Sequence, residues 1–172
     1  MIILHDFRLS DKVVKTLSDY GEPLAFDAQQ FIKFPALVGH PDLFCCMGWQ
    51  KPIIAPNTPR YVINKLKSKN IDFQFGKTLV GDSKETISAY NVAVGSTLVI
   101  HNKRYTDPVI MQNMQDKIFI HVNQSFTRCS TMVFPEDNFI TSDKLIFARL
   151  DKMNKNCLYV HPEQIVLPGL NY

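Results

Sequence analysis

IILHDFRLSDKVVKTLSDYGEPLAFD, the stretch from Ile2 to Asp27, decides the fold that we expect for this 172-residue chain. It contains an apolar strand, a turn, an amphipathic helix and a second apolar strand, in that order. The same order recurs in PIIAPNTPRYVINKLKSKNIDFQF (Pro52–Phe75), TLVIHNKRYTDPVIMQNMQDKIFIHV (Thr97–Val122) and FITSDKLIFARLDKMNKNCLYVH (Phe139–His161). A repeat of this size usually defines the whole architecture. Equivalent positions of successive units then converge in space, so we expect a site at matching positions.

Each repeat predicts one amphipathic helix that covers a sheet. A capping side chain, in two cases followed by proline, is typical of a helix N-terminus. The expected caps are Ser10, Thr58, Asp107 and Asp143. The apolar positions expected to face a sheet are Val13, Val14 and Leu17; Val62, Ile63 and Leu66; Val109, Ile110 and Met114; and Ile146, Phe147 and Leu150.

The second to fourth repeats carry one more strand in front, joined by a short turn as in a hairpin. These leading strands are expected at Asp42–Met47, Asn91–Gly95 and Cys129–Phe134. The full unit is therefore strand, strand, helix, strand, and the first unit lacks its leading strand. We expect one α/β domain over residues 1–172, with units at about 1–35, 36–80, 81–122 and 123–172.

Composition is that of an ordinary globular protein, and it excludes several function classes. The formal net charge is 19 − 16 = +3, which is too weak to argue for nucleic acid. The densest basic set, Lys65, Lys67 and Lys69, is expected on a solvated helix face rather than in a phosphate patch. No apolar run reaches the ~18 residues that a membrane span needs. Without a signal peptide or paired cysteine motif, the chain is expected to be cytoplasmic with reduced thiols.

Several short pieces resemble an uncharacterised, mostly bacterial family of the pentein fold. The pieces are His40-Pro41-Asp42, Tyr90–Gly95, Asn123–Thr131, Asn138–Asp143 and Leu167-Pro168-Gly169. The pentein fold is an α/β propeller of strand-strand-helix-strand units. It is shared by guanidino-group-modifying enzymes, such as arginine deiminases and amidinotransferases, and by a ribosome anti-association factor. The resemblance implies a pentein-like propeller for this chain, with four units visible.

The same resemblance implies a missing part. Members of that family continue after Leu167-Pro168-Gly169 into a glycine-rich fifth unit. This chain is therefore expected to be a shortened or truncated member. Four units would leave an open sheet edge and an apolar surface, which native proteins normally cover. A homodimer through that edge is a possible consequence.

Three polar residues, Asp42, Asn91 and Cys129, stand at the start of the leading strands and are expected to point toward one axial pocket. Asp42 is a candidate carboxylate for a guanidinium or amine, or else a residue that caps a turn after Pro41. Asn91 is a candidate for hydrogen-bonding a ligand, or else a turn residue. Gln124 stands near the position where the resemblance places a catalytic histidine. Glutamine cannot relay a proton at neutral pH, so Gln124 is expected to assist Asp42 and Asn91 in binding a ligand.

The candidates for catalysis are weaker. His40 is a candidate acid or base, with an ordinary polar loop residue as the simpler interpretation. Cys129 is a candidate nucleophile, but the resemblance places the enzymes' nucleophile in the fifth unit, which favours a buried structural thiol. His101, His121 and His161 are expected to be separate surface residues. We expect no metal site and no cofactor, since no His/Cys spacing matches a zinc motif.

The sequence is consistent with two alternative functions. One is an axial pocket for a small guanidino or amine ligand; an enzyme with this pocket would be a hydrolase or amidinotransferase of guanidino compounds. The other is a non-catalytic binding or interaction module that uses an outer face or open edge. The position of Gln124 favours the second, and the expected convergence of Asp42 and Asn91 favours the first.

Overall fold

The computed structural model describes residues 1–47 and 50–164, and the repeat is visible throughout that part. The first unit consists of β1 (Ile2–Asp6), α1 (Asp11–Ser18) and β2 (Glu22–Phe26). Its two strands pair in parallel, with Leu4 opposite Leu24. Trp49, for which the sequence favours a packing role near the hairpin turn, and the Leu167–Gly169 piece lie outside the described residues.

The other three units each form a three-stranded sheet. In each, the leading strand pairs antiparallel with the middle strand, and the strand after the helix pairs parallel with the same middle strand. The elements are β3 (Cys45–Met47), β4 (Pro52–Ile54), α2 (Arg60–Ser68) and β5 (Gln74–Phe75); β6 (Ala93–Val94), β7 (Leu98–His101), α4 (Pro108–Asn113) and β8 (Ile118–His121); and β9 (Thr131–Phe134), β10 (Asn138–Thr141), α6 (Lys144–Lys152) and β11 (Cys157–Tyr159). The predicted strand-strand-helix-strand order is therefore confirmed, within a mixed α/β fold of several small sheets.

The leading strands are shorter than predicted, because a turn or a single helical turn replaces each of their first residues. Asp42 lies in η1 (Pro41–Leu43), Asn91 in the turn before β6, and Cys129 in α5 (Thr127–Ser130). The buried hydroxyl of Thr127 anchors the start of α5, because its single hydrogen is shared between the carbonyl oxygens of Ile100 at 2.7 Å and Asn91 at 3.0 Å. The remaining short helices are α3 (Lys84–Ile87), η2 (Pro135–Asp137) and η3 (Pro162–Gln164).

The helix caps follow the prediction in two of four cases. Asp107 accepts from the amide of Val109, and Asp143 accepts from the amides of Leu145 and Ile146. Ser10 stands at the N-cap of α1 without a side-chain cap hydrogen bond. The prediction for Thr58 is wrong: α2 begins at Arg60, and the Thr58 hydroxyl donates instead to the carbonyl oxygen of Ala55, at 2.8 Å.

Helix α1 is less buried than the other long helices. The helices α2, α4 and α6 bury predicted residues, which are Val62 and Leu66, Val109 and Ile110, and Ile146 and Leu150. By contrast, α1 buries no residue, and Val13 is 43% exposed. The sheet below α1 has only two strands, so it offers a narrower surface for the helix to cover.

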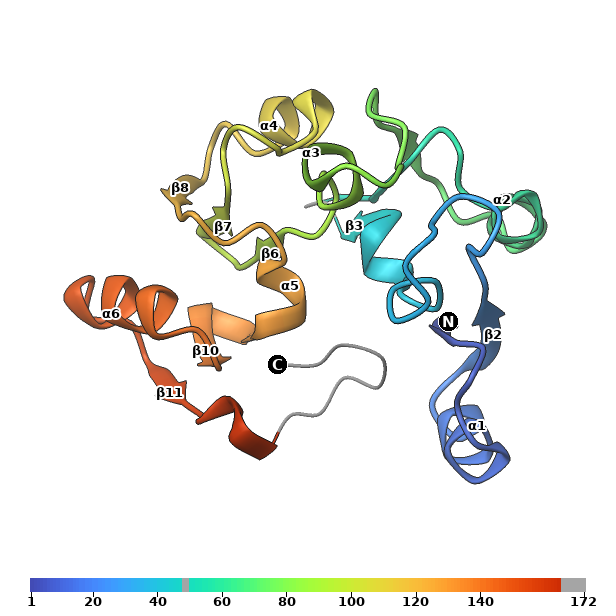
Figure 1. The fold of residues 1–172 in the computed structure, drawn as a ribbon, viewed down its shortest axis with the longest axis horizontal. Helices are drawn as coiled ribbons and strands as arrows, with labels where there is room; N and C mark the ends of the chain where they lie inside the picture. Colours follow the sequence, from blue (N-terminus) through green and yellow to red (C-terminus); the bar gives the residue numbers. More distant parts are fainter. Residues whose placement is uncertain (48–49, 165–172) are drawn as a thin grey trace.

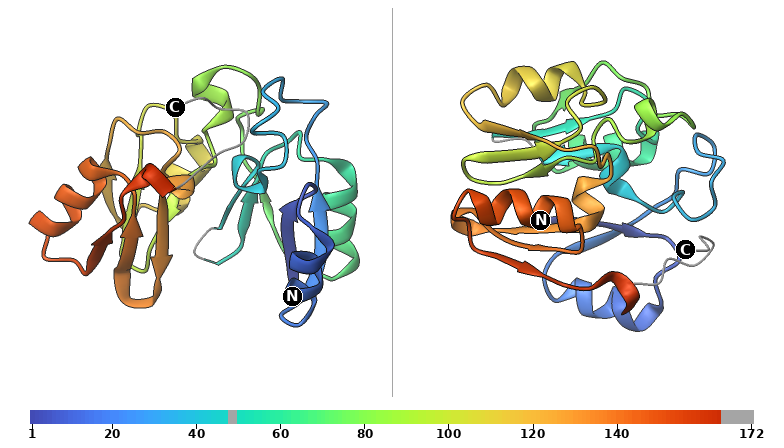
Figure 2. Two further views of the ribbon diagram at one scale, coloured as in Figure 1. Left: turned by 60° about the horizontal axis from the view of Figure 1, so that its bottom comes forward. Right: turned by 60° about the vertical axis from the view of Figure 1, so that its left-hand side comes forward.

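The units follow one another along an arc. In Figure 1, α1, α2, α4 and α6 lie on its outer side, and β3, β6 and α5 lie on its inner side. The first and last units lie at opposite ends of the arc, which the left view of Figure 2 also shows. One buried cluster joins the first three units, and a second joins β6–β8 to the β9–β11 unit. No helix in the described ranges is long and apolar enough to cross a membrane.

Hydrogen bonds to Asp107 connect the second unit to the third. Its side chain is fully buried, and besides capping α4 it accepts from the amides of Lys77 and Thr78 at 2.8 and 2.7 Å. The phenol of Tyr90 donates to the same carboxylate at 3.2 Å. Burial raises the pKa of Asp107, but these backbone donors outweigh it, so the pKa lies below its usual value. A single carboxylate thus orients the loop after β5, the segment before β6 and the start of α4.

Candidate functional site

The first unit positions the loop that carries His40 and Asp42. Gly39 lies against the side chain of Asp6 at the end of β1, and a Cβ on Gly39 would come within 2.2 Å of that carboxylate. Asp6 in turn accepts two hydrogen bonds from the guanidinium of Arg8. Arg8 also donates to the carbonyl oxygen of Pro35, at 2.8 Å, so it fastens the loop to the end of the strand. The absence of a side chain at position 39 therefore permits this close approach.

Asp42 lies at the centre of a cluster drawn from three units. Its Oδ2 accepts from Nδ2 of Asn91 at 2.8 Å and from the thiol of Cys129 at 3.1 Å. Its Oδ1 lies 3.5 Å from Nδ1 of His40. The Asp42 side chain is 26% exposed, so the carboxylate is largely withdrawn from solvent but still reached by it.

Asn91 is fully buried and uses its whole side chain within this cluster. Besides Asp42, Nδ2 donates to the sulfur of Cys129 at 3.2 Å. Its Oδ1 accepts from the amides of Arg128 and Cys129 at 2.9 and 3.3 Å. An amide has two donor hydrogens and one acceptor oxygen, so these four bonds satisfy it. The residue holds α5 and η1 in fixed relation to each other.

Cys129 differs from the buried thiol that was predicted, since the residue is exposed. It lies on a single helical turn at the surface rather than within a strand, which explains the difference. Its sulfur nevertheless faces inward, where it contacts Asp42 and Asn91 and lies 3.9 Å from Nδ1 of His40. Cys129 is thus the member of the cluster that lies closest to the surface of the chain.

The charges of the cluster are interdependent. Burial raises the pKa of Asp42, but its interactions with His40, Cys129 and Asn91 outweigh burial and place the pKa below its usual value. The Asp42 carboxylate raises the pKa of His40 against the opposing effect of burial. Burial of the thiol, and then the adjacent Asp42 charge, raise the pKa of Cys129 well above its usual value. The site is therefore a carboxylate beside a protonated thiol.

The structure brings four of the five sequence candidates together: His40, Asp42, Asn91 and Cys129. Gln124 is engaged elsewhere, because its Oε1 accepts from the amides of Ser125 and Phe126. The Asp6–Arg8 pair beside His40 was missed by sequence reasoning. No motif signals it, since only the approach of Gly39 to Asp6 brings the two segments together.

The three histidines at strand ends do not form one group. His101 and His121 are register partners on β7 and β8, whereas His161 lies near Glu163 after β11. The prediction that all three are surface residues is wrong for His101, which is fully buried. Its Nε2 donates to the carbonyl oxygen of Ser125 at 2.8 Å, and its Nδ1 pairs with the Thr106 hydroxyl at 2.7 Å. Those two partners replace water around the ring.

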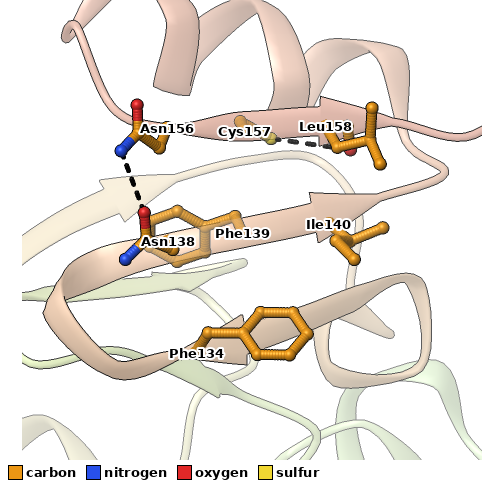
Figure 3. Close-up of a pocket in the computed structure, with 7 residues that line it drawn as sticks. All are labelled: Phe134, Asn138, Phe139, Ile140, Asn156, Cys157 and Leu158. Atoms are coloured by element: carbon orange, nitrogen blue, oxygen red, sulfur yellow. Dashed lines mark hydrogen bonds between the residues drawn. The ribbon is translucent and has the colours of Figure 1, made fainter.

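A second feature is an open hollow of about 430 Å³ on the β9–β10–β11 sheet. Figure 3 shows its lining, in which Phe134, Ile140 and Leu158 come from three neighbouring strands. Phe134 and Leu158 are 40% and 59% exposed. The lining holds no charged side chain, so its chemistry suits an apolar contact rather than an ion. The other lining residues are Asn138, Phe139, Asn156 and Cys157.

Comparison with known proteins gives one match. Residues 4–172 match the model of a family described as a family of unknown function (DUF6873). No curated protein matches the chain, and no solved structure matches it.

Proposed function

The chain belongs to the DUF6873 family, whose function is unknown, and we propose that it is a small-ligand-binding protein that holds a guanidino or amine cation at Asp42. The order of its units supports a pentein-like propeller as the architecture, with Asp42, Asn91 and α5 on its inner side. A ligand there would lie near the axis, where equivalent positions of three units meet. The observation that carries the proposal is the Asp42 carboxylate, which is ionised and 26% exposed.

The hydrogen bonds of Asp42 support a cationic rather than a neutral ligand. An ionised carboxylate has about four acceptor positions. The two bonds from Asn91 and Cys129 both go to Oδ2. Oδ1 has His40 as its neighbour at 3.5 Å, beyond a short hydrogen bond. Oδ1 is therefore the oxygen at which a ligand N–H would be accepted, with Asn91 keeping the carboxylate in position.

We propose binding rather than covalent catalysis. A cysteine nucleophile needs its thiolate form, which a lowered pKa provides. Cys129 has the opposite environment, because burial and the Asp42 charge raise the pKa of its thiol. Nδ1 of His40 lies 3.9 Å from the sulfur and 3.5 Å from Oδ1 of Asp42, whose interaction with the imidazole raises the pKa of His40, so this nitrogen engages the carboxylate rather than the thiol.

The experiment is a calorimetric titration of the purified chain with arginine and agmatine, with thermal shift as a second readout. Replacement of Asp42 by Asn keeps the shape but removes the charge, and it should weaken binding roughly 10- to 100-fold, the worth of a charge-assisted hydrogen bond. Asp143→Asn is the matched control, since Asp143 caps α6 away from the cluster. Absence of binding by both cations, or equal affinity in Asp42→Asn, would refute the proposal.

A second candidate, an interaction module without a small ligand, is favoured by the apolar hollow on the β9–β10–β11 sheet. Met132, on the same sheet, is 56% exposed and adds to this surface. If this face joins two copies of the chain, light scattering will show a dimer that Leu158→Lys converts to a monomer. A monomer at all concentrations would remove this candidate.

A further inference from the structure

We infer that His40, Asp42 and Cys129 form a three-ligand site for a divalent transition metal of the zinc type. One ligand atom from each residue lies within 4.8 Å of the other two. His40 and Asp42 are two positions apart in the chain, but Cys129 is 87 positions from Asp42, so no local spacing reveals the set. The ligands are an imidazole nitrogen, a carboxylate oxygen and a thiol sulfur, each a common zinc ligand.

The distances fit one small ion between the three groups. A tetrahedral zinc ion with bonds of about 2.0–2.3 Å keeps its ligand atoms roughly 3.3–3.6 Å apart. Nδ1 of His40 lies 3.5 Å from Oδ1 of Asp42 and 3.9 Å from the sulfur of Cys129, and that sulfur lies 3.1 Å from Oδ2, the other oxygen of the same carboxylate. One donor atom from each residue lies within 4.8 Å of the other two, so rotation of the Asp42 carboxylate and small shifts of its neighbours would bring three donors to tetrahedral separations on one ion.

The nature of the donors selects the class of metal. A thiolate and an imidazole favour zinc, cobalt and related ions, whereas calcium and magnesium prefer sites made of oxygen atoms alone. The thiolate and the neutral imidazole are the binding forms, so metal binding replaces the S–H bond by a metal–sulfur bond and releases to solvent the thiol proton and any proton on the ligating nitrogen of His40. Three protein ligands leave a fourth position for water or another donor. The side chain of Asp42 is 26% exposed, so solvent reaches the site beside this ligand.

Asn91 supplies the surrounding support that such a site needs. Its Nδ2 donates to Oδ2 of Asp42 and to the sulfur of Cys129, so one buried amide orients two of the three ligands. Hydrogen bonds of this kind fix ligand geometry around metals and affect affinity about 10- to 100-fold. Asn91 is thus a positioning residue in this inference and does not bind the metal.

The metal site goes beyond the organic-cation pocket and shares only Asp42 with it. A guanidinium or amine requires the carboxylate but not the sulfur. A metal requires Cys129 and His40 as well. Cys129→Ser should therefore abolish metal binding but retain arginine or agmatine binding, because the serine hydroxyl can replace the thiol as donor to Oδ2 of Asp42, whereas Asp42→Asn should weaken both. The two ligands and the two variants therefore distinguish failure of the metal site from failure of the organic-cation pocket.

The test uses the full chain with cobalt(II) alone, followed by zinc(II). We expect one equivalent of cobalt to bind and to produce a near-ultraviolet sulfur-to-cobalt charge-transfer band, which zinc then removes. The band should be lost in Cys129→Ser and retained in Cys157→Ser, the matched control with a second partly accessible thiol. A wild-type chain without the band, or a band that persists in folded Cys129→Ser, would overturn the inference.

A second measurement does not depend on any variant. X-ray absorption of the zinc-loaded wild-type chain should show one sulfur scatterer at ~2.3 Å together with nitrogen or oxygen scatterers. Zinc surrounded by nitrogen and oxygen alone would overturn the inference even if Cys129→Ser failed to fold.

Discussion

Asn91 holds Cys129 at two points. Its Oδ1 accepts from the Cys129 amide at 3.3 Å, and its Nδ2 donates to the Cys129 sulfur at 3.2 Å. The same Nδ2 donates to Asp42 in the preceding unit. The position of the sulfur relative to the carboxylate therefore depends on one buried amide, which does not itself reach the surface.

Asn91→Ala should destabilise the chain and disorder the site together. It leaves Oδ2 of Asp42 and two backbone amides of α5 without this partner, so we expect the free energy of unfolding to fall by about 2–3 kcal/mol. Urea denaturation measures this loss, and cobalt or agmatine titration measures the effect on the site. Asn113→Ala is the control, because Asn113 is exposed on α4 and its loss should cost under ~0.5 kcal/mol. Equal costs at the two positions would contradict the role given to Asn91.

Asp107→Ala should be among the most destabilising single changes in the chain. It removes the cap of α4 and takes a fully buried acceptor from the amides of Lys77 and Thr78 and from the phenol of Tyr90, so we expect a loss of about 3 kcal/mol or more. Asp143→Ala removes only the cap of α6 and should cost about 1 kcal/mol. Thermal or urea unfolding of both variants gives the comparison. If Asp107→Ala lowers the free energy of unfolding no more than Asp143→Ala does, the contacts of Asp107 between the second and third units are unimportant for stability.

Stability should fall on mild acidification because of His101. Burial lowers the pKa of His101 to about 4, against about 6.5 in the unfolded chain. The unfolded state therefore binds a proton more readily between these values, so this contribution is complete above about pH 6.5 and is lost as the pH falls toward 4. We expect a loss of about 2 kcal/mol between about pH 7 and pH 5.

Urea unfolding at both pH values, for the wild type and two variants, tests this dependence. His101→Gln should remove most of the pH dependence, although it lowers stability at both values. His121→Gln is the matched control, since His121 is the exposed register partner of His101 on β8. A pH dependence that survives in His101→Gln would assign it to other groups.

Gly39→Ala should disturb the site from the side of the first unit. The new Cβ would come within 2.2 Å of the Asp6 carboxylate, so Asp6 must give up its arrangement with Arg8. We expect a loss of about 1–3 kcal/mol, the usual cost of overpacking, and weaker ligand binding at the neighbouring His40 and Asp42. Gly81→Ala is the control, because its nearest neighbour, the Thr86 hydroxyl, lies at 3.3 Å. Unchanged stability in Gly39→Ala would show that the loop has room to move.

Much of the fold could be predicted because the repeat is written in local patterns. The spacing of Val62 and Leu66, or of Ile146 and Leu150, requires only that apolar residues avoid water along one helix face. Asp107 and Asp143 act as caps because an N-terminal amide needs an acceptor, whatever the rest of the fold. The predictions for Thr58 and His101 were wrong because the spacing of residues along the sequence does not reveal their hydrogen bonds. Thr58 donates to Ala55, and His101 donates to Ser125.

The sequence by itself determined the order of strands and helices and the equivalence of Asp42, Asn91 and Cys129 within successive units, since both follow from short-range periodicity. Only the tertiary structure decided that Asp42 accepts from the Cys129 thiol, that Asn91 lies beneath both, and that Gln124 is occupied elsewhere. Asp42 and Cys129 are 87 positions apart, and their relative orientation depends on how whole units pack against each other. The protonation of Cys129 follows the same reasoning, because burial and a neighbouring charge are properties of the assembled site.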